Sequence, residues 1–422
     1  MGDPRDPALD RREFLQRTAL LGAGLLAGTR AWPASAADAP PAAAPADAAA
    51  RVRAFRTLGR TGLRVSDVGF GSSSLAGDVA LVRHALERGV NYFDTAESYQ
   101  GGAAEETLGR ALEGRRDEVL VASKVQAGPH DSRDEILRAL EGSLRRLRTD
   151  HVDVYFNHAV NDVARLRNDE WREFSSRAKE AGKIRFTGMS GHGGRLVECI
   201  DHAVQHDLFD VFLVGYNFGQ DPGFVARLTK DLDFVAVNQE LPGALARARA
   251  AGMGVVAMKT LRGARLNDLR PYETGGATFA QAAFRWVLAG PNVDALVVTM
   301  RSPAQVDEYL GGSGGLPPTA EDLRLLARYE ARHGREQCRY GCRGCADACP
   351  LGVPIADVLR VRMYAEDYGD AGLARREYAA LGGAVGVASA CASCAHRSCV
   401  PACGHGLDVA SLAARAHRAA AG

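Results

Sequence analysis

The sequence predicts an α/β chain in which a (β/α)8 TIM barrel is followed by a small, mainly α-helical domain. Eight short apolar or β-branched runs alternate with amphipathic stretches from Phe55 to about Gly315, and eight of the nine cysteines lie between Cys338 and Cys403. Such alternation predicts a parallel sheet, and eight units in about 260 residues match the size of a barrel. A doubly wound sheet is the competing fold. The segment Gly69-Phe70-Gly71-Ser72-Ser73-Ser74 lacks the third glycine of a dinucleotide-binding turn, which favours the barrel.

The predicted elements of the barrel follow one another without a break. The expected strands are Val65–Phe70, Tyr92–Asp94, Val119–Ser123, Val152–Phe156, Ile184–Met189, Val211–Tyr216, Val255–Met258 and Ala295–Val298. The expected helices between and after them are Val79–Arg88, Glu105–Glu113, Arg133–Arg146, Trp171–Ala181, Leu196–His206, Ala244–Ala251, Phe279–Ala289 and Pro303–Leu310. The barrel domain is therefore expected over residues 55–315.

Composition sets broad limits on the function. The chain has 422 residues, of which 46% are hydrophobic and 24% charged, and these values are typical of a globular protein with two or three domains. The 52 basic residues nearly balance the 51 acidic ones, so no nucleic-acid partner is expected. Only five of the basic residues are lysines. A lysine retained in so arginine-rich a chain suggests a role that needs an amine.

The amino-terminal segment resembles a bacterial twin-arginine export signal. Arg11 and Arg12 precede Phe14-Leu15, an apolar run follows from Thr18 to Gly28, and Ala34-Ser35-Ala36 is a plausible cleavage site. The run is too short for a membrane span, which needs about 20 residues. We expect a signal peptide at 1–36, an Ala/Pro-rich linker at 37–54, export to the periplasm and no stable membrane span in the mature chain; a chance arginine pair is the alternative. The twin-arginine route carries folded proteins, so it suits cofactors inserted in the cytoplasm.

Four polar side chains are expected at the carboxyl ends of neighbouring strands, where barrels of this type place their catalytic groups. They are Asp94, Tyr99 in the loop after it, Lys124 and His158. An ammonium near the phenol lowers its high pKa, and a carboxylate keeps that ammonium charged and oriented. The imidazole can orient a carbonyl oxygen or relay a proton. The set therefore predicts general acid–base catalysis by Tyr99, although each residue alone also has an ordinary structural explanation.

Several motifs resemble the aldo-keto reductase family over roughly Phe55 to Leu310. They are Gly89-Val90-Asn91-Tyr92-Phe93-Asp94-Thr95-Ala96-Glu97-Ser98-Tyr99, Glu105-Glu106-Thr107-Leu108-Gly109, Ser123-Lys124, Val152-Asp153-Val154-Tyr155-Phe156-Asn157-His158, Gly182-Lys183-Ile184-Arg185 and Arg285-Trp286-Val287-Leu288. The resemblance implies a (β/α)8 reductase with a nicotinamide cofactor, NADP or NAD. It also implies that Tyr99 is the acid/base and that Asp94, Lys124 and His158 complete a catalytic tetrad.

The resemblance further implies which residues bind the cofactor. The matching positions are Ser190, Arg301, Ser302 and Glu308. The departures from the family pattern are Gly191-His192 at an asparagine position, Leu213 at a glutamine, Gln305 at an arginine and Tyr309 at an asparagine.

Cysteine spacing predicts a metal or cluster domain at residues 320–415. The eight cysteines form the groups Cys338-x3-Cys342-x2-Cys345-x3-Cys349-Pro350 and Cys391-x2-Cys394-x4-Cys399-x3-Cys403. Both groups resemble the runs of two-cluster ferredoxins, in which the fourth cysteine of each run binds the other cluster. The resemblance implies two [4Fe–4S] clusters, one on Cys338, Cys342, Cys345 and Cys403 and the other on Cys391, Cys394, Cys399 and Cys349. Two zinc sites and four disulfides remain as alternatives. Cys199 is expected to be a small core residue.

Together these features predict an exported oxidoreductase of aldo-keto reductase type that interconverts a carbonyl and an alcohol on a small molecule. Its iron–sulfur clusters would exchange electrons with a redox protein or a quinone-linked partner. The alternative is an iron–sulfur electron-transfer or binding protein whose barrel is catalytically idle.

Overall fold

The computed structural model describes residues 50–75, 77–219, 240–261, 273, 278–333, 338, 342–367, 370–382 and 388–421. The described residues belong to one compact unit, residues 49–422, which contains the barrel and the cysteine-rich region. The expected signal peptide and most of the expected linker lie outside the described residues.

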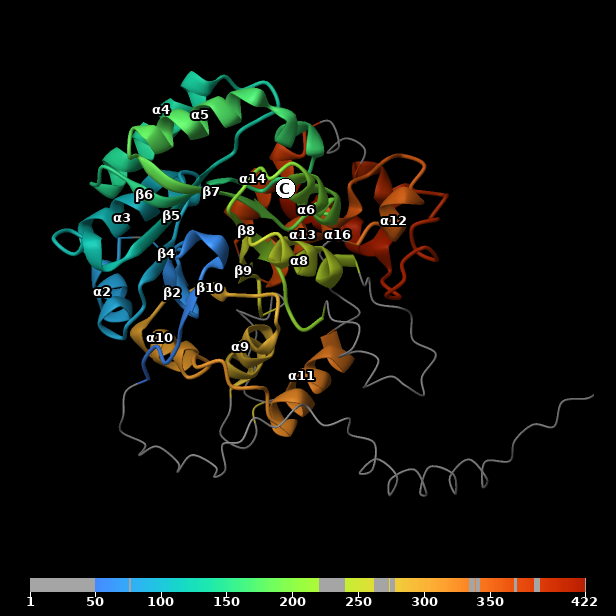
Figure 1. The fold of residues 1–422 in the computed structure, drawn as a ribbon. Helices are drawn as coiled ribbons and strands as arrows, with labels where there is room; N and C mark the ends of the chain where they lie inside the picture. Colours follow the sequence, from blue (N-terminus) through green and yellow to red (C-terminus); the bar gives the residue numbers. More distant parts are fainter. Residues whose placement is uncertain are drawn as a thin grey trace, which may run out of the picture. The chain divides into compact units, whose positions relative to one another are not determined.

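Eight parallel strands close into a barrel (Figure 1), as the sequence predicts. The strands are β3 (Val68–Gly71), β4 (Tyr92–Asp94), β5 (Leu120–Val125), β6 (Val152–Asn157), β7 (Ile184–Gly191), β8 (Val211–Gly215), β9 (Gly254–Met258) and β10 (Ala295–Thr299). Each strand pairs with its sequence neighbour, and β10 pairs with β3 to close the ring. Because all strands run in the same direction, their carboxyl ends meet at one mouth.

The first expected strand, Val65–Phe70, is two strands in the structure. Its beginning is β2 (Arg64–Ser66), which pairs antiparallel with β1 (Phe55–Thr57), and only β3 belongs to the barrel. The chain bends between them at the buried Asp67, whose carboxylate accepts bonds from Ser313 Oγ (2.5 Å) and Gly314 N (2.8 Å). Val65 packs with inward-facing residues of the barrel, so the hairpin shares their core.

Amphipathic helices surround the strands, and side-chain caps set several of their starts. The helices are α2 (Val79–Glu87), α3 (Ala103–Ala111), α4 (Arg133–Leu147), α5 (Asp169–Glu180), α6 (Leu196–Gln205), α8 (Glu240–Ala250), α9 (Phe279–Ala289) and α10 (Pro303–Leu310). Short 3-10 turns are η1 (Gly59–Thr61), η2 (Tyr99–Gly102), η3 (Arg116–Glu118) and η4 (Val163–Arg167). A reciprocal capping box between Ser132 and Glu135 begins α4, and Asp78 caps α2. Cys199 lies buried on α6, as expected.

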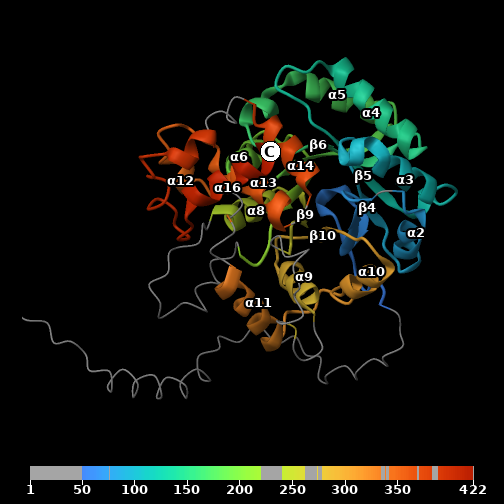
Figure 2. The same ribbon diagram turned by 180° about the vertical axis from the view of Figure 1, so that it is seen from behind.

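The region after the barrel is helical. It contains α11 (Ala320–His333), α12 (Gly344–Asp347), α13 (Ile355–Arg362), the π-helical turn η8 (Met363–Asp367), α14 (Ala371–Ala380), the 3-10 turn η9 (Ala390–Ser393) and α16 (Val409–Ala421). Figure 2 shows α11 beside α9 of the barrel. The elements from α12 onward share a hydrophobic core of their own, which includes Cys345 and Cys403. Within the described residues, no helix is long and apolar enough to cross a membrane.

Candidate active site at the carboxyl end of the barrel

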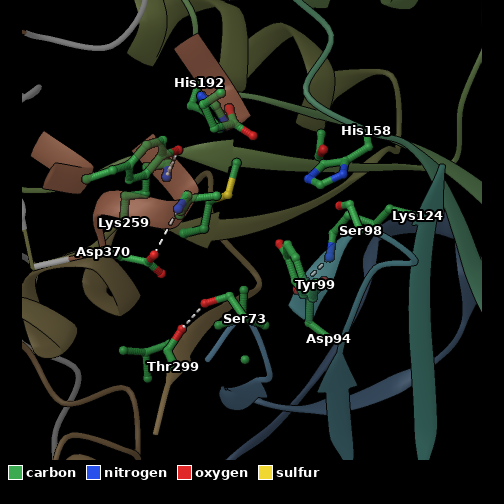
Figure 3. A pocket seen from close by; sticks show the side chains of 18 of the residues that line it. Ser73, Asp94, Ser98, Tyr99, Lys124, His158, His192, Lys259, Thr299 and Asp370 are labelled. Atoms are coloured by element: carbon green, nitrogen blue, oxygen red, sulfur yellow. Dashed lines mark hydrogen bonds and ion pairs between the residues drawn. The ribbon is translucent and has the colours of Figure 1, made fainter. Parts of the chain in front are cut away.

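The structure brings the four predicted catalytic residues together at the mouth of the barrel (Figure 3). Asp94 ends β4, Lys124 lies in β5, Tyr99 begins η2 and His158 follows β6. Lys124 Nζ donates to Asp94 Oδ1 (2.7 Å) and to the carbonyl oxygen of Thr95 (2.5 Å). The same ammonium lies 4.8 Å from the ring centroid of Tyr99, which lies edge-on to the ring of His158 at 5.7 Å.

Burial dominates the electrostatics of this group. It raises the pKa of Asp94, against the opposing charge of Lys124, and it lowers the pKa of Lys124 against the charge of Asp94. Burial raises the pKa of Tyr99 well above its usual value, and the charge of Asp94 adds to this shift. Burial also lowers the pKa of His158 well below its usual value, and Lys124 reinforces this effect.

The direction of the Tyr99 shift differs from the expectation that Lys124 would lower this pKa. Asp94 neutralises the ammonium across a bond of 2.7 Å, so the phenol is affected mainly by desolvation and by nearby negative charge. The resting site therefore holds a protonated phenol and a neutral imidazole. This is the acid form needed to protonate a carbonyl oxygen.

The cavity at the mouth has a volume of about 260 Å³ and is lined by strand ends and by the carboxyl-terminal region. The carboxyl-terminal residues that line it are Tyr364, Asp370, Leu373, Arg376, Glu377 and Ala380. Lys259, directly after β9, lines it as well, and its Nζ donates to the Tyr364 hydroxyl at 2.7 Å. The sequence analysis missed all of these residues. Only Lys259 carried a signal, since it is a scarce lysine at the end of an expected strand.

Four buried polar atoms of the cavity wall have no hydrogen-bond partner among the described residues. They are Asp94 Oδ2, His158 Nδ1, His192 Nδ1 and Thr260 Oγ1. A buried polar atom without a partner is costly, so such atoms are often met by a bound ligand or water. His192 stands at the position where the family pattern has asparagine. Burial lowers its pKa well below the usual value, and Arg360 and Lys259 add to the shift.

The predicted cofactor residues fall in two places. Ser190 lines the cavity, and its hydroxyl accepts a bond from Ala159 N (2.9 Å). Arg301, Ser302 and Glu308 are not among the residues that line it. Arg301 donates to Ser74 Oγ (3.2 Å), and Ser302 caps α10. Burial raises the pKa of Glu308, which is half-buried.

Two departures from the family pattern contact each other on α10. Gln305 Nε2 donates to the Tyr309 hydroxyl (2.8 Å), and Gln305 Oε1 accepts from Arg301 N (2.8 Å). Both polar atoms of the Gln305 side chain therefore have hydrogen-bond partners in or next to this helix. A third departure, Leu213, lies in the apolar interior of the barrel.

The nine cysteines are thiols rather than disulfides in the structure. Electrostatic effects among seven of the eight carboxyl-terminal cysteines fall largely into two sets, although Cys399 of one set also raises the pKa of Cys345 in the other. Burial raises the pKa of Cys345 to about 12, and Cys403 and then Cys342 add most to this shift. Burial also raises the pKa of Cys391 and of Cys399, and Cys349 adds most to both. Each run's last cysteine therefore lies near the other run.

No three histidine, cysteine, aspartate or glutamate side chains of the described residues are arranged to hold a single metal ion. A four-iron cluster places an iron atom under each thiolate, so its ligands stand farther apart than those of one ion. The two sets of cysteines correspond to the exchanged pairing that the ferredoxin resemblance implies.

Comparison with known proteins relates the barrel to one family. The sequence profile of the aldo/keto reductase family matches residues 67–324. L-galactose dehydrogenase from Arabidopsis thaliana is 28% identical over 298 residues, which is 66% of this chain and 93% of that protein. A probable voltage-gated potassium channel subunit beta from Oryza sativa is 27% identical and covers 62% of this chain and 92% of its own length. The crystal structure of a Klebsiella pneumoniae aldo/keto reductase in complex with NADP and acetate is 26% identical, with a TM-score of 0.51, and covers 66% of this chain and 95% of that one.

Proposed function

Because this chain belongs to the aldo/keto reductase family of oxidoreductases, we propose that it interconverts a carbonyl and an alcohol with Tyr99 as general acid and base. One observation carries the proposal: the Lys124 ammonium lies 4.8 Å from the centroid of the half-buried Tyr99 ring and is itself bonded to Asp94 at 2.7 Å, within a cavity large enough for a small molecule.

Each residue of the tetrad has a distinct task. The protonated Tyr99 hydroxyl gives its proton to the carbonyl oxygen as the carbonyl carbon is reduced, and takes it back in the reverse direction. Lys124 stabilises the phenolate that this transfer leaves, and Asp94 holds Lys124 in place. His158 is neutral, so one ring nitrogen can donate a hydrogen bond that orients the carbonyl.

A nicotinamide nucleotide is the proposed reductant, as the NADP complex of the Klebsiella relative suggests. When bound, it supplies a hydride. Ser190 and the unpartnered Nδ1 of His192 fit the amide of a nicotinamide, because both residues line the cavity beside His158. Arg301 and Ser302 at the start of α10 and Glu308 near its end match the family's nucleotide-binding positions.

The substrate is proposed to be a small polar metabolite such as a sugar. L-galactose dehydrogenase is similar over 93% of its length. The cavity supports this class because charged and hydroxyl-bearing residues line much of its wall.

The direct test compares Tyr99→Phe with Tyr92→Phe. Both changes remove one phenolic hydroxyl, and the buried hydroxyl of Tyr92 bonds to nothing among the described residues. We expect Tyr99→Phe to lower kcat for aldehyde reduction by about 10²- to 10⁴-fold, with Tyr92→Phe close to wild type. Equal rates in wild type and Tyr99→Phe would refute the catalytic assignment.

The second candidate is an electron-transfer or binding protein with an idle barrel. Leu213 in the barrel interior and the Gln305–Tyr309 bond favour it, since neither arrangement offers a polar group to a nucleotide. This candidate predicts no turnover of carbonyls or alcohols by wild type, whichever nicotinamide is added.

The cysteine-rich region is proposed to hold two [4Fe–4S] clusters. They would pass single electrons between the enzyme and a redox protein or quinone-linked partner. The grouping of the thiols into two sets supports this proposal. Iron and acid-labile sulfide should be present in the anaerobically purified chain. Zinc in place of iron would support the alternative of two zinc sites with four thiolate ligands each.

Export by the twin-arginine route is the last part of the proposal. A chain loaded with clusters in the cytoplasm would need a route for folded proteins. Cell fractionation of wild type and of an Arg11→Lys/Arg12→Lys variant tests it. We expect periplasmic wild type and cytoplasmic variant; wild type found in the cytoplasm would contradict it.

A further inference from the structure

A second amine–phenol pair lines the cavity, apart from the tetrad. Lys259 Nζ lies 2.7 Å from the Tyr364 hydroxyl and 4.5 Å from the centroid of its ring. The first pair, Lys124 and Tyr99, comes wholly from the barrel. The second joins the end of β9 to η8 of the carboxyl-terminal region, and η8 lies outside the residues that match the family.

The two pairs face the cavity from different sides. Figure 3 shows Lys259 and Asp370 on one side and Tyr99 and His158 on the other. The charge of Tyr364 contributes to the raised pKa of Tyr99, so the two phenols are within electrostatic reach of each other. Because all four residues line one cavity of about 260 Å³, a single small molecule can contact both pairs.

The backbone at Lys259 supports a role for its side chain. Its φ of +56° lies in the left-handed region, which is uncommon and costly for a residue other than glycine. Glycine would fit this turn more easily. A lysine at this position, one of only five in the chain, places an amine at the cavity wall.

The charges on the described residues that line the cavity balance. Its acidic lining residues are Asp94, Asp370 and Glu377, and its basic ones are Lys124, Lys259 and Arg376. Both histidines of the wall are held neutral by burial. A cavity with no excess charge favours an uncharged ligand over an anion such as a phosphate ester.

We propose that Lys259 and Tyr364 form a second oxygen-binding subsite, which holds a hydroxyl of a neutral hydroxy-carbonyl substrate while its carbonyl group lies at Tyr99. This inference rests on the proposed function and narrows its substrate class. An ammonium is a donor and a phenol both donates and accepts, so the pair matches a hydroxyl, which does both. The carboxyl-terminal region thereby sets the specificity of the barrel.

The test compares kcat/KM for a set of substrates between wild type and a set of variants. The substrates are an aldose and its monodeoxy analogues, in each of which one hydroxyl is replaced by hydrogen. The variants are Tyr364→Phe and Lys259→Met. The matched controls are Tyr378→Phe, whose hydroxyl bonds to His417 Nδ1 at 2.7 Å, and Lys179→Met, on a surface helix. Neither control residue lines the cavity.

Wild type should prefer the parent aldose over one deoxy analogue by about 10-fold or more in kcat/KM. Tyr364→Phe and Lys259→Met should each reduce this preference to about 2-fold by losing activity on the parent alone, and the controls should keep it. An unchanged preference in both variants would overturn the subsite. So would equal losses on parent and analogue.

Failure of the subsite and failure of the proposed function give different results. The same comparison is made for equilibrium binding to the Tyr99→Phe chain, where turnover plays no part. If Tyr99→Phe turns over as fast as wild type, the catalytic assignment fails, and the binding comparison still decides the subsite.

Discussion

Asn161, in the loop after β6, donates a hydrogen bond from Nδ2 to Asp357 Oδ2 in α13 at 2.5 Å. Asp357 also pairs with the buried Arg360, whose guanidinium lies 3.6 Å from Glu377 in the cavity wall. A chain of polar contacts therefore runs from the barrel through α13 to the active cavity. The carboxyl-terminal region is thus part of the site.

Removal of the Asp357 carboxylate should destabilise the protein strongly. Among the described residues, Asp357→Ala leaves the buried Arg360 with the more distant Glu377 as its remaining acidic partner, and loss of one partner of a buried ion pair typically costs about 3–5 kcal/mol. Chemical denaturation measures the change in free energy of unfolding. The control is Asp150→Ala, whose carboxylate is 95% exposed and should cost less than about 1 kcal/mol. Similar losses in both variants would argue against a structural role for this network.

Gly193 and Gly194 form a matched pair of neighbours at the same contact. A Cβ on Gly193 would lie 2.1 Å from Asn161 Oδ1 and 2.6 Å from Asp357 Oδ1, whereas one on Gly194 would lie 3.1 Å from Ala356 Cβ. Gly193→Ala should therefore cost about 1–3 kcal/mol and expose the carboxyl-terminal region to limited proteolysis. Gly194→Ala should behave nearly like wild type. If the two variants are cut equally fast, the close approach at Gly193 is unimportant for docking.

The buried histidines predict a loss of stability in mild acid. The folded protein lowers the pKa of both His158 and His192, so their contribution is complete above the unfolded value of about 6.5 and is lost as pH falls below it. Between about pH 6 and 5, each histidine should lower the free energy of unfolding by about 1.4 kcal/mol for each unit by which the pH falls. His192→Gln should remove about half of this slope. Identical slopes in wild type and His192→Gln would count against the burial argument.

Double cysteine variants test the proposed pairing of the clusters. If Cys345 and Cys403 share a cluster, Cys345→Ala/Cys403→Ala should keep half of the wild-type iron. Cys345→Ala/Cys349→Ala should lose nearly all of it, because the two residues would serve different clusters. Cys199→Ala, in the barrel core, is the control and should keep all the iron. The opposite pattern in the two double variants would assign each cluster to one run.

The barrel and its tetrad could be predicted from the sequence because their signals are local. Alternating apolar runs indicated the eight strands, and the strand-end rule then placed Asp94, Lys124 and His158 at one mouth. The break at Asp67 could not be predicted in this way. It depends on bonds to Ser313 and Gly314, about 246 residues away.

The carboxyl-terminal wall of the cavity could not be predicted either, because it also depends on contacts between residues far apart in the sequence. Tyr364 and Glu377 reach the site only because α13 and α14 pack against the barrel mouth, and no periodicity in the sequence encodes that contact. Tyr364 and Glu377 also add negative charge near Tyr99, and together with desolvation and Asp94 they explain why its pKa rises although the composition of the tetrad suggested a fall. Lys259 was accessible to sequence reasoning, through the scarcity of lysine and its place after an expected strand.

A labelled hydride, followed under anaerobic conditions, tests whether the barrel reduces a carbonyl with Tyr99 as the proton donor. Wild type is given an aldose and a reduced nicotinamide nucleotide with deuterium at the transferable position, and the alcohol product is analysed by mass spectrometry. We predict one deuterium on the new carbinol carbon, formed at least about 10²-fold more slowly by Tyr99→Phe. An alcohol without deuterium would contradict hydride transfer from the nucleotide, and one formed equally fast by Tyr99→Phe would contradict proton donation by Tyr99.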